Sequence, residues 1–237
     1  MMSAAVGGAC EALTTAAPPN DGRLSARPRD GVATTLASGP LGLGGERDGI
    51  VQMPSAKGSG KLPVLLFLHG ATQSGAAMLR RIGPAADQAG VVVVAPDSRG
   101  TTWDAIRGDF DEDVTFLNRV LESVFARLDV DSTRLAIGGF SDGASYGLSL
   151  GLANGDLFSR GVICSPGFVI QAPAHGRGRF FVSHGTADQI LPIDQCSRVI
   201  VPRLRAMGYD VAYREFEGRH ELPPDIATEA MRWMTGA

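Results

Sequence analysis

The stretch LAIGGFSDG, residues 135–143, decides the fold of this chain. Residues 135–139 are apolar or small and predict a buried β-strand, and the residues after Ser141 have the pattern of a helix. A serine between two such elements lies on a sharp turn that lifts its hydroxyl clear of the sheet, and the small residues Gly139 and Gly143 avoid clashes there. Because a serine hydroxyl needs such exposure to act as a nucleophile, the stretch predicts a nucleophilic serine at position 141.

The pattern G-x-S-x-G alone does not choose this serine, because it occurs three times in succession, at Ser141, Ser145 and Ser149. Only Ser141 follows an apolar strand pattern. Ser145 and Ser149 lie within a helix predicted over 142–153, where four-residue spacing places them on one face. We therefore interpret these two serines as structural.

Strands and helices alternate on both sides of this stretch. The apolar runs typical of buried parallel strands are Pro63–Leu68, Val91–Ala95, Leu135–Gly139, Gly161–Ser165, Phe180–Ser183 and Val211–Phe216. The helical patterns cover Ala76–Ala89, the segment around Val114–Leu128, Asp142–Ala153, Ile193–Met207 and Pro223–Met234. Pro202 predicts a kink or a late start in the fourth helix. The alternation predicts an α/β fold with a mostly parallel, doubly wound sheet and helices on both faces.

The segment before the first buried strand differs from the rest. Residues 1–21 have the composition of a disordered tail, and residues 22–237 are predicted to form one domain. Within it, the extended pieces Arg23–Arg27 and Asp48–Met53 are predicted to pair as an antiparallel edge.

Composition narrows the class of partner. The net charge is −3, with 44% hydrophobic and 20% charged residues, and no basic run interleaved with aromatics suggests nucleic-acid binding. The three cysteines, Cys10, Cys164 and Cys196, are too scattered for a disulfide framework or a zinc site, and they suit a reducing cytoplasm. No apolar run approaches the roughly 20 residues of a membrane span. We expect a cytoplasmic protein that acts on a small molecule; the oligomeric state is left open, a homodimer included.

A serine nucleophile needs a base, and the base needs an acid that orients it. Asp188 follows the predicted strand Phe180–Ser183, and His220 follows the strand Val211–Phe216. Because the carboxyl ends of parallel strands meet at one edge of the sheet, both side chains are predicted to lie near Ser141. The chain order nucleophile, acid, base is then Ser141, Asp188, His220.

Other residues of the right chemistry are weaker candidates. His175 precedes the acid in the chain and lies in a loop, while His69 and His184 end strands and are interpreted as structural. Asp194 follows a proline at a predicted helix start, where a role as N-cap explains it. Cys164 lies in a buried strand without a sharp turn, so an inert thiol is expected.

The developing oxyanion of an acyl-transfer reaction needs two N–H donors. The candidates are the backbone N–H of Asp142, after the nucleophile, and that of Ala71, in the loop after the first buried strand. Gly70 allows the backbone a close approach there. Trp103, in the loop after the second strand, is a candidate for lining an acyl pocket, with core packing as the alternative.

A run of carboxylates precedes the second predicted helix, formed by Asp109, Asp111, Glu112 and Asp113. Its spacing does not match a calcium-binding loop. Acidic residues at a helix start favour the helix dipole, so we interpret the run as helix capping and predict no metal site.

The chain resembles the phospholipase/carboxylesterase family of α/β hydrolases and is also similar to polyhydroxybutyrate-depolymerase-like esterases. The resemblance runs from about Gly22 to Trp233 and is carried by LFLHG at 66–70, GFSDGAS at 139–145, HGTAD at 184–188 with Leu191-Pro192, and GRH at 218–220. The chain departs from the family at Asp142, where glutamine is common, and at Arg219, where glycine is common. The resemblance implies an α/β-hydrolase fold with Ser141 as nucleophile, Asp188 as acid and His220 as base.

Residues and resemblance together predict a serine carboxylesterase that forms an acyl-enzyme on Ser141 and needs no cofactor. The connection from Ser165 to Phe180 is short and no cap domain is evident, so we expect an open site that favours esters of short acyl chains. Two alternatives stay open at this point: a thioesterase or small-peptide hydrolase with the same three residues, and a non-catalytic binding protein with the same fold.

Overall fold

The computed structural model describes residues 21–43, 45–56 and 60–236, which form an eight-stranded sheet in the order β1-β2-β4-β3-β5-β6-β7-β8. The strands are β1 (Gly39–Pro40), β2 (Gly49–Gln52), β3 (Leu62–Leu68), β4 (Val92–Pro96), β5 (Val130–Phe140), β6 (Arg160–Cys164), β7 (Arg179–Gly185) and β8 (Asp210–Phe216). Strands β3 to β8 are parallel to one another, whereas β1 and β2 pair antiparallel at one edge. The predicted mostly parallel sheet is therefore confirmed. The tail predicted for residues 1–21 lies, except for Asp21, outside the described residues.

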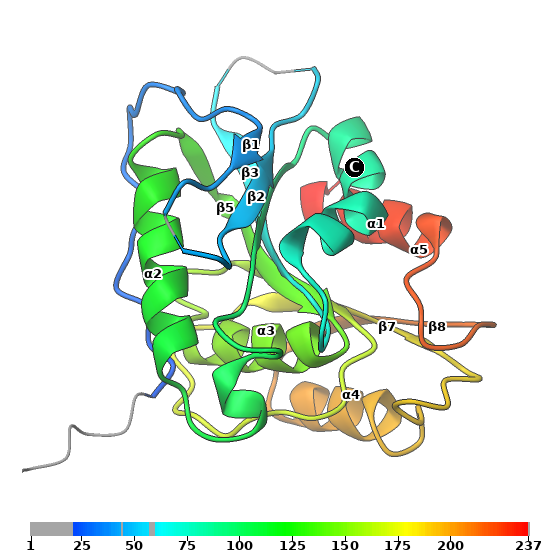
Figure 1. Cartoon of the computed structure of the whole chain (residues 1–237). Helices are drawn as coiled ribbons and strands as arrows, with labels where there is room; N and C mark the ends of the chain where they lie inside the picture. Colours follow the sequence, from blue (N-terminus) through cyan, green and yellow to red (C-terminus); the bar gives the residue numbers. More distant parts are fainter. Residues whose placement is uncertain (1–20, 44, 57–59, 237) are drawn as a thin grey trace, which may run out of the picture.

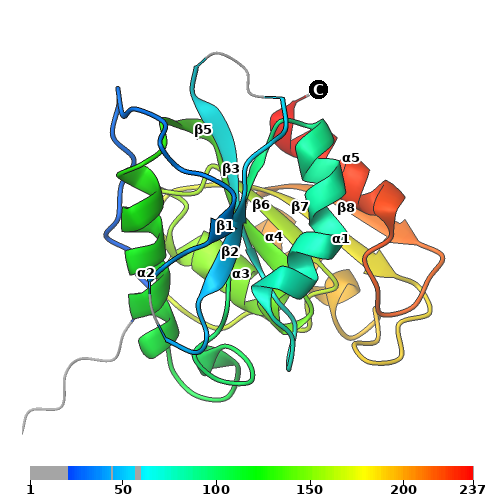
Figure 2. The same cartoon turned by 45° about the horizontal axis from the view of Figure 1, so that its top comes forward.

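Helices cover both faces of the sheet. They are α1 (Gly75–Gln88), α2 (Glu112–Phe125), α3 (Asp142–Ala153), α4 (Ser197–Ala206) and α5 (Pro224–Thr235), with a short 3₁₀ helix, η1, at Asp104–Ile106. Figure 2 shows the sheet passing between α2 on one side and α1 with α5 on the other. Helices α3 and α4 lie side by side on the face that α2 covers (Figure 1).

The alternation of side chains along the strands supplies a core for each face. In β3, Leu65 and Phe67 point toward α1 and α5, whereas Leu66 and Leu68 point toward α2. All four side chains are fully buried. A strand buried on both faces must be apolar throughout, which is why the sequence shows a continuous apolar run rather than alternation.

The order of the strands places the carboxyl ends of β3 and β5 side by side. The chain moves from β3 to β4 on one side and then returns past β3 to β5 on the other, so the connections leave the two strand ends in opposite directions. Ligands of such sheets bind at this reversal point, because the diverging connections leave a crevice there. The residues after β3 and β5 are the predicted N–H donor loop and Ser141.

The predicted pairing at the sheet edge is half right. Strand β2 lies within Asp48–Met53 and is antiparallel, but its partners are β1 and β4. Arg23–Arg27 is not a strand. Its N–H groups bond to side chains instead: Ser25 N–H donates to Asn118 Oδ1 on α2, and other N–H groups of the segment bond in the same manner.

Two further boundaries differ from the prediction. Strand β5 begins at Val130, earlier than the predicted Leu135, and its pairing with β3 shifts register between Leu62 and Val64. Helix α4 begins at Ser197 rather than Ile193, and Pro202 lies inside it. The late start agrees with one of the two effects expected of that proline.

Candidate active site

Ser141 lies on a strained turn between β5 and α3. Its backbone has φ 60° and ψ −124°, a conformation that residues other than glycine rarely adopt. The neighbouring glycines have no room for a side chain: a Cβ at Gly139 would lie 2.4 Å from the carbonyl oxygen of Gly143, and one at Gly143 would lie 2.3 Å from that of Leu68. The close approach of three backbone segments therefore explains both glycines.

Three side chains from different loops form a hydrogen-bonded chain at this turn. Ser141 Oγ lies 2.8 Å from Nε2 of His220, and Nδ1 of His220 lies 2.6 Å from Oδ2 of Asp188. Asp188 follows β7 and His220 follows β8, so the sheet brings together residues that are 79 and 47 positions from Ser141 in the sequence. The structure thus places the three residues predicted from sequence within hydrogen-bonding distance.

The carboxylate of Asp188 is held by the backbone as well as by His220. Its Oδ1 accepts N–H groups from Ile190, at 2.9 Å, and Leu191, at 2.8 Å. Burial alone would raise the pKa of Asp188, but the bonds from Leu191, His220 and Ile190 lower it below the ordinary value. Asp188 is therefore an ionised acceptor at neutral pH, which is the state that orients an imidazole.

The loops that carry Asp188 and His220 are joined to each other. Ala187 N–H donates to the carbonyl of Gly218 at 2.9 Å, and a Cβ at Gly185 would lie 2.3 Å from the carbonyl oxygen of Arg219. The ring of His220 also packs on that of Phe140, with centroids 4.7 Å apart. These contacts limit the motion of His220 relative to the turn at Ser141.

The loop after β3 approaches the serine turn closely. A Cβ at Gly70 would lie 3.2 Å from the Cβ of Ser141, which explains the glycine there. Thr72 has φ 60°, and its N–H donates to the carbonyl of Thr101 at 2.7 Å. Within the described part of the chain, the N–H groups of Ala71 and Asp142 have no hydrogen-bond acceptor. Two backbone donors are thus left available beside the serine hydroxyl.

His69 holds this loop in place through hydrogen bonds, as expected of a structural histidine. The ring is fully buried; Nδ1–H donates to the carbonyl of Gly70 at 2.7 Å, and Nε2 accepts the N–H of Ser98 at 2.9 Å. Burial lowers the pKa of His69, so the ring is neutral and acts as one donor and one acceptor.

Trp103 does not reach the surface. It is fully buried, its Nε1–H donates to the carbonyl of His69 at 2.8 Å, and its ring stacks on Tyr146. The alternative of core packing is therefore confirmed. Trp103 contacts the site only through the backbone of the loop that it supports.

One contact beside Ser141, between Thr102 and Asp142, could not be predicted from the sequence. Thr102 Oγ1 donates to Asp142 Oδ2 at 2.6 Å, so the carboxylate next to Ser141 is tied to the loop after β4. A polar pair 40 residues apart leaves no local pattern, although position 142 is one at which the sequence departs from the family that it resembles.

Ser145 and Ser149 anchor the connection between β6 and β7. Ser145 Oγ accepts the N–H of Gly167, and Ser149 Oγ accepts the N–H of Ile170, each at 2.9 Å. Both serines are buried. Their spacing of one helical turn matches an extended segment that runs along α3, which confirms that they are structural.

The remaining candidates lie outside the hydrogen-bonded chain. His175 is exposed, as predicted for a loop residue. Cys164 is fully buried, and burial raises the pKa of its thiol to about 12, so it is not a thiolate at neutral pH. Asp194 is not an N-cap: α4 begins after Cys196, and the Asp194 carboxylate pairs with Arg198 at 2.8 Å.

The acidic run before α2 differs from simple capping. Asp111 is the N-cap residue but makes no side-chain cap bond. Asp113 is buried and accepts the N–H groups of Arg99, at 2.6 Å, and Asp104, at 2.8 Å. Among the residues that the structure describes, no group of three or more possible ligands could hold a metal ion.

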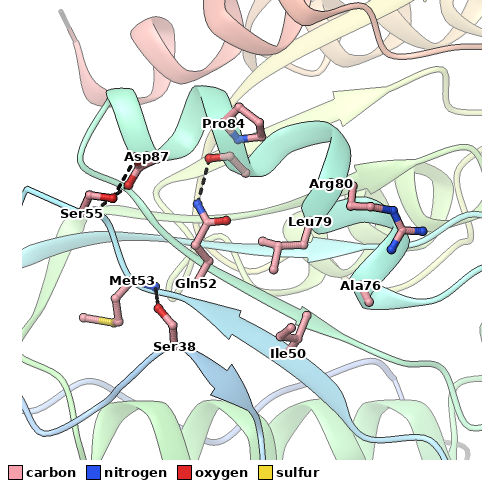
Figure 3. A pocket seen from close by; sticks show the side chains of 11 residues that line it. Ser38, Ile50, Gln52, Met53, Ser55, Ala76, Leu79, Arg80, Pro84 and Asp87 are labelled. Carbon is pink, nitrogen blue, oxygen red and sulfur yellow. Dashed lines mark hydrogen bonds between the residues drawn. The ribbon is translucent and has the colours of Figure 1, made fainter.

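A groove of about 750 Å³ lies elsewhere, between strand β2 and helix α1 (Figure 3). Gln52 crosses it and donates to the carbonyl of Gly83 at 2.8 Å, while Ser55 and Asp87 bond at one end. None of its lining residues belongs to the chain of Ser141, His220 and Asp188. No helix of the described residues has the length and apolar character that crossing a membrane requires.

Comparisons with known proteins agree with the fold described above. The chain matches no protein-family model. It is 31% identical over 147 residues to "Putative esterase NocK" of Nocardia uniformis subsp. tsuyamanensis, a match that covers 57% of this chain and 42% of that relative. It thus spans less than half the length of the relative.

Solved structures similar to this one include esterase PE8, with a TM-score of 0.67 and 19% identity, covering 81% of this chain and 99% of that one. A carboxylesterase from Mesorhizobium loti has a TM-score of 0.61 and 20% identity, covering 85% of this chain and 100% of that one. At such identities the likeness concerns the fold. The chain has the α/β-hydrolase fold, as the resemblance implied.

Proposed function

We propose that the chain is a serine carboxylesterase in which Ser141 is the nucleophile, His220 the general base and Asp188 the acid that orients His220. The observation that carries the proposal is the unbroken hydrogen-bonded chain from Ser141 Oγ through both ring nitrogens of His220 to Asp188. It lies on a strained turn at the reversal point of the sheet, where a substrate can reach it.

The geometry supports acyl transfer in two steps. Ser141 Oγ attacks the ester carbonyl carbon while its proton passes to Nε2 of His220, and the oxyanion accepts the N–H groups of Ala71 and Asp142. The intermediate collapses as the alcohol leaves with the proton from His220, which leaves an acyl group on Ser141. Water then attacks the acyl carbon while His220 takes a proton from that water. The carboxylic acid product departs as His220 returns the proton to Ser141 Oγ.

The proposed substrate is a small carboxylic ester. The three connections that follow β6, β7 and β8 are short, and within the described residues 60–236 no inserted domain covers the serine. An uncovered site gives little apolar surface to a long acyl chain, so we expect the highest kcat/KM with short acyl chains.

The test is hydrolysis of p-nitrophenyl esters from acetate to palmitate by the full chain and by two alanine variants. Ser141→Ala should lower kcat by about 10⁴-fold or more, since without the nucleophile only substrate binding and the two N–H donors can still accelerate hydrolysis. Ser149→Ala is the matched control, because it also lies in a G-x-S-x-G pattern but bonds only the backbone of α3 and Ile170. It should keep most of the activity.

A fluorophosphonate probe separates the alternatives. Labelling of wild type and Ser149→Ala, but not of folded Ser141→Ala, supports the nucleophile. Labelling without turnover of any ester would redirect the proposal toward thioesters or small peptides. No labelling of the folded wild type would contradict the proposal and favour a binding protein.

A further inference from the structure

A second histidine contacts the same carboxylate as His220. His184 lies at the end of β7, four residues before Asp188, and is fully buried. Its Nε2 lies 3.3 Å from Asp188 Oδ2, the oxygen that His220 also binds, and 2.8 Å from the carbonyl oxygen of Leu191. His184 therefore touches both ends of the turn that holds the acid.

The hydrogen bonds of His184 assign its tautomer. A carbonyl oxygen only accepts, so Nε2 must carry the hydrogen that bonds Leu191. In a neutral ring Nδ1 is then an acceptor, and the hydroxyl of Ser197, 2.6 Å away, must donate to it. Ser197 is the first residue of α4 and is fully buried, so no water competes for this bond.

The charge state of His184 agrees with this assignment. Burial lowers the pKa of His184, so the ring is neutral at pH 7. A neutral ring holds the carbonyl of Leu191 without supplying a positive charge beside Asp188 that would compete with His220. The other groups that titrate near this ring are Glu215, its register partner on β8, and Cys196, beside Ser197.

We propose that His184 is a positioning residue for the acid: its Nε2–H holds the carbonyl of Leu191, whose own N–H bonds Oδ1 of Asp188, while the hydroxyl of Ser197 holds Nδ1 and with it the ring, so that Oδ2 faces His220. Asp188 receives N–H bonds from Ile190 and Leu191 on Oδ1, and Nε2 of His184 lies 3.3 Å from the other oxygen, Oδ2. The link joins the start of α4 to the acid through Ser197, His184 and Asp188. The catalytic consequence rests on the proposed esterase function, whereas the structural consequence does not.

Substitutions at Ser197 test the donor. Ser197→Ala removes the hydroxyl, so Nδ1 loses its donor and the ring is free to tilt out of line with the carbonyl of Leu191. Ser197→Thr keeps a hydroxyl and is the matched control. With p-nitrophenyl acetate, Ser197→Ala should lower kcat by roughly ten- to a hundredfold with little change in KM, because the reacting groups are misaligned rather than unbound. Ser197→Thr should recover most of that loss.

Substitutions at His184 give a second test if Ser197→Ala does not fold. His184→Gln places an amide N–H near the position of Nε2, whereas His184→Asn places its amide near Nδ1 and leaves the carbonyl of Leu191 without a donor. Glutamine should therefore retain more activity than asparagine at equal thermal stability. Equal losses, or the reverse order, would overturn the proposal.

Two readouts distinguish positioning from general stability. The acid limb of the pH profile of kcat/KM should move to lower pH in Ser197→Ala, because a displaced Asp188 stabilises protonated His220 less. The low-field ¹H resonance of the His220 Nδ1 proton, which bonds Asp188 at 2.6 Å, should move upfield or broaden in the same variant and stay in place in Ser197→Thr.

The resonance also separates this proposal from the proposed function. If wild type hydrolyses no ester but the resonance changes in Ser197→Ala, the esterase proposal fails and the positioning role stands. If the resonance and kcat of folded Ser197→Ala match those of wild type, His184 does not position the acid and the inference is wrong.

Discussion

Backbone strain is concentrated at the carboxyl edge of the sheet. Within the described residues, three residues other than glycine have positive φ: Thr72, Ser141 and Ser165, which follow β3, β5 and β6. Each such conformation costs about 1–3 kcal/mol and persists only where surrounding contacts fix it. Thr72 and Ser141 flank the two unpaired N–H groups of Ala71 and Asp142, so the strain fixes the donors before any substrate arrives.

Substitution of Ser141 by two small residues measures this strain. Ser141→Ala keeps a Cβ and hence the strain, whereas Ser141→Gly relieves it at the cost of glycine's greater freedom in the unfolded chain, about 0.5–1 kcal/mol. We expect the free energy of unfolding of Ser141→Gly to exceed that of Ser141→Ala by about 1 kcal/mol, as measured by urea denaturation. A less stable glycine variant would show that the turn is not strained.

At the scale of elements, helix α3 depends on its lack of side chains on the face that meets β5. A Cβ at Gly147 would lie 3.0 Å from the carbonyl carbon and oxygen of Gly138, so helix and strand backbones are in direct contact. Such contact leaves α3 no room to shift, and Ser141 sits immediately before its first residue. The position of Ser141 is therefore tied to the packing of the whole helix.

Gly147→Ala tests this contact against helix propensity. Alanine is favoured over glycine in a helix by about 1 kcal/mol, but the new methyl group meets backbone that cannot move aside. We expect a net loss of about 1–3 kcal/mol in the free energy of unfolding, measured in urea. Gly108→Ala is the control, since its Cβ would meet nothing closer than 3.8 Å. A stabilised Gly147→Ala would contradict the close packing.

The start of helix α2 gives the protein a pH-dependent element. Burial raises the pKa of Asp113 from 3.8 to about 6. Between these values the native state keeps a proton that the unfolded state releases, so this contribution to stability is complete at low pH and is lost as pH rises toward 6. The neighbouring Arg99 and Asp104 N–H groups reduce the effect but do not abolish it.

Asp113→Asn isolates this contribution, because asparagine does not titrate. The free energy of unfolding of wild type minus that of the variant should fall by about 3 kcal/mol between about pH 4 and pH 6, since each unit of pKa corresponds to about 1.4 kcal/mol. Chemical denaturation at several pH values measures it. A difference independent of pH would show that Asp113 has an ordinary pKa.

Local sequence patterns predict the main elements and the residues of the candidate site, but not the polar contacts between distant segments. The turn at Ser141 and the strand ends before Asp188 and His220 follow from short patterns, because apolar runs and glycines mark them. The prediction of a strand at Arg23–Arg27 is wrong because the backbone N–H groups of this segment bond to side chains. One of these, the side chain of Asn118, lies 91 residues beyond the segment's end. The bond between Ser197 and His184 has the same character: a polar contact across the fold that no periodicity marks.

At the scale of the molecule, a single sheet carries all parts of the candidate site. The donors follow β3, the serine follows β5, and the acid and base follow β7 and β8. The sheet core is buried on both faces, so the relative positions of these loops depend on the whole core rather than on any one contact. The proposed esterase activity and global stability should thus be lost together on unfolding.

Deletion of residues 1–20 tests the domain boundary predicted from composition. The chain from Asp21 onward contains every described contact, including the bond from Arg23 N–H to Asp21. We expect the deletion to leave the melting temperature and kcat unchanged, measured by thermal unfolding and p-nitrophenyl acetate hydrolysis. A lower melting temperature would show that the tail contributes to the fold, and size-exclusion chromatography of both forms would test for a homodimer.

The connection from β6 to β7 has a consequence for engineering. It is pinned at one end by Ser145 and Ser149 and at the other by the bridge between Gly155 and Gly176 and the bond from His175 N–H to the carbonyl of Leu152, while Pro173 and Ala174 between these anchors are exposed. Exposed tips between fixed ends tolerate foreign sequence well. A ligand-binding module grafted at this tip would pull on Gly167, and through Ser145 on the helix that begins beside Ser141, so the proposed esterase could be converted into a reporter whose output depends on an unrelated molecule.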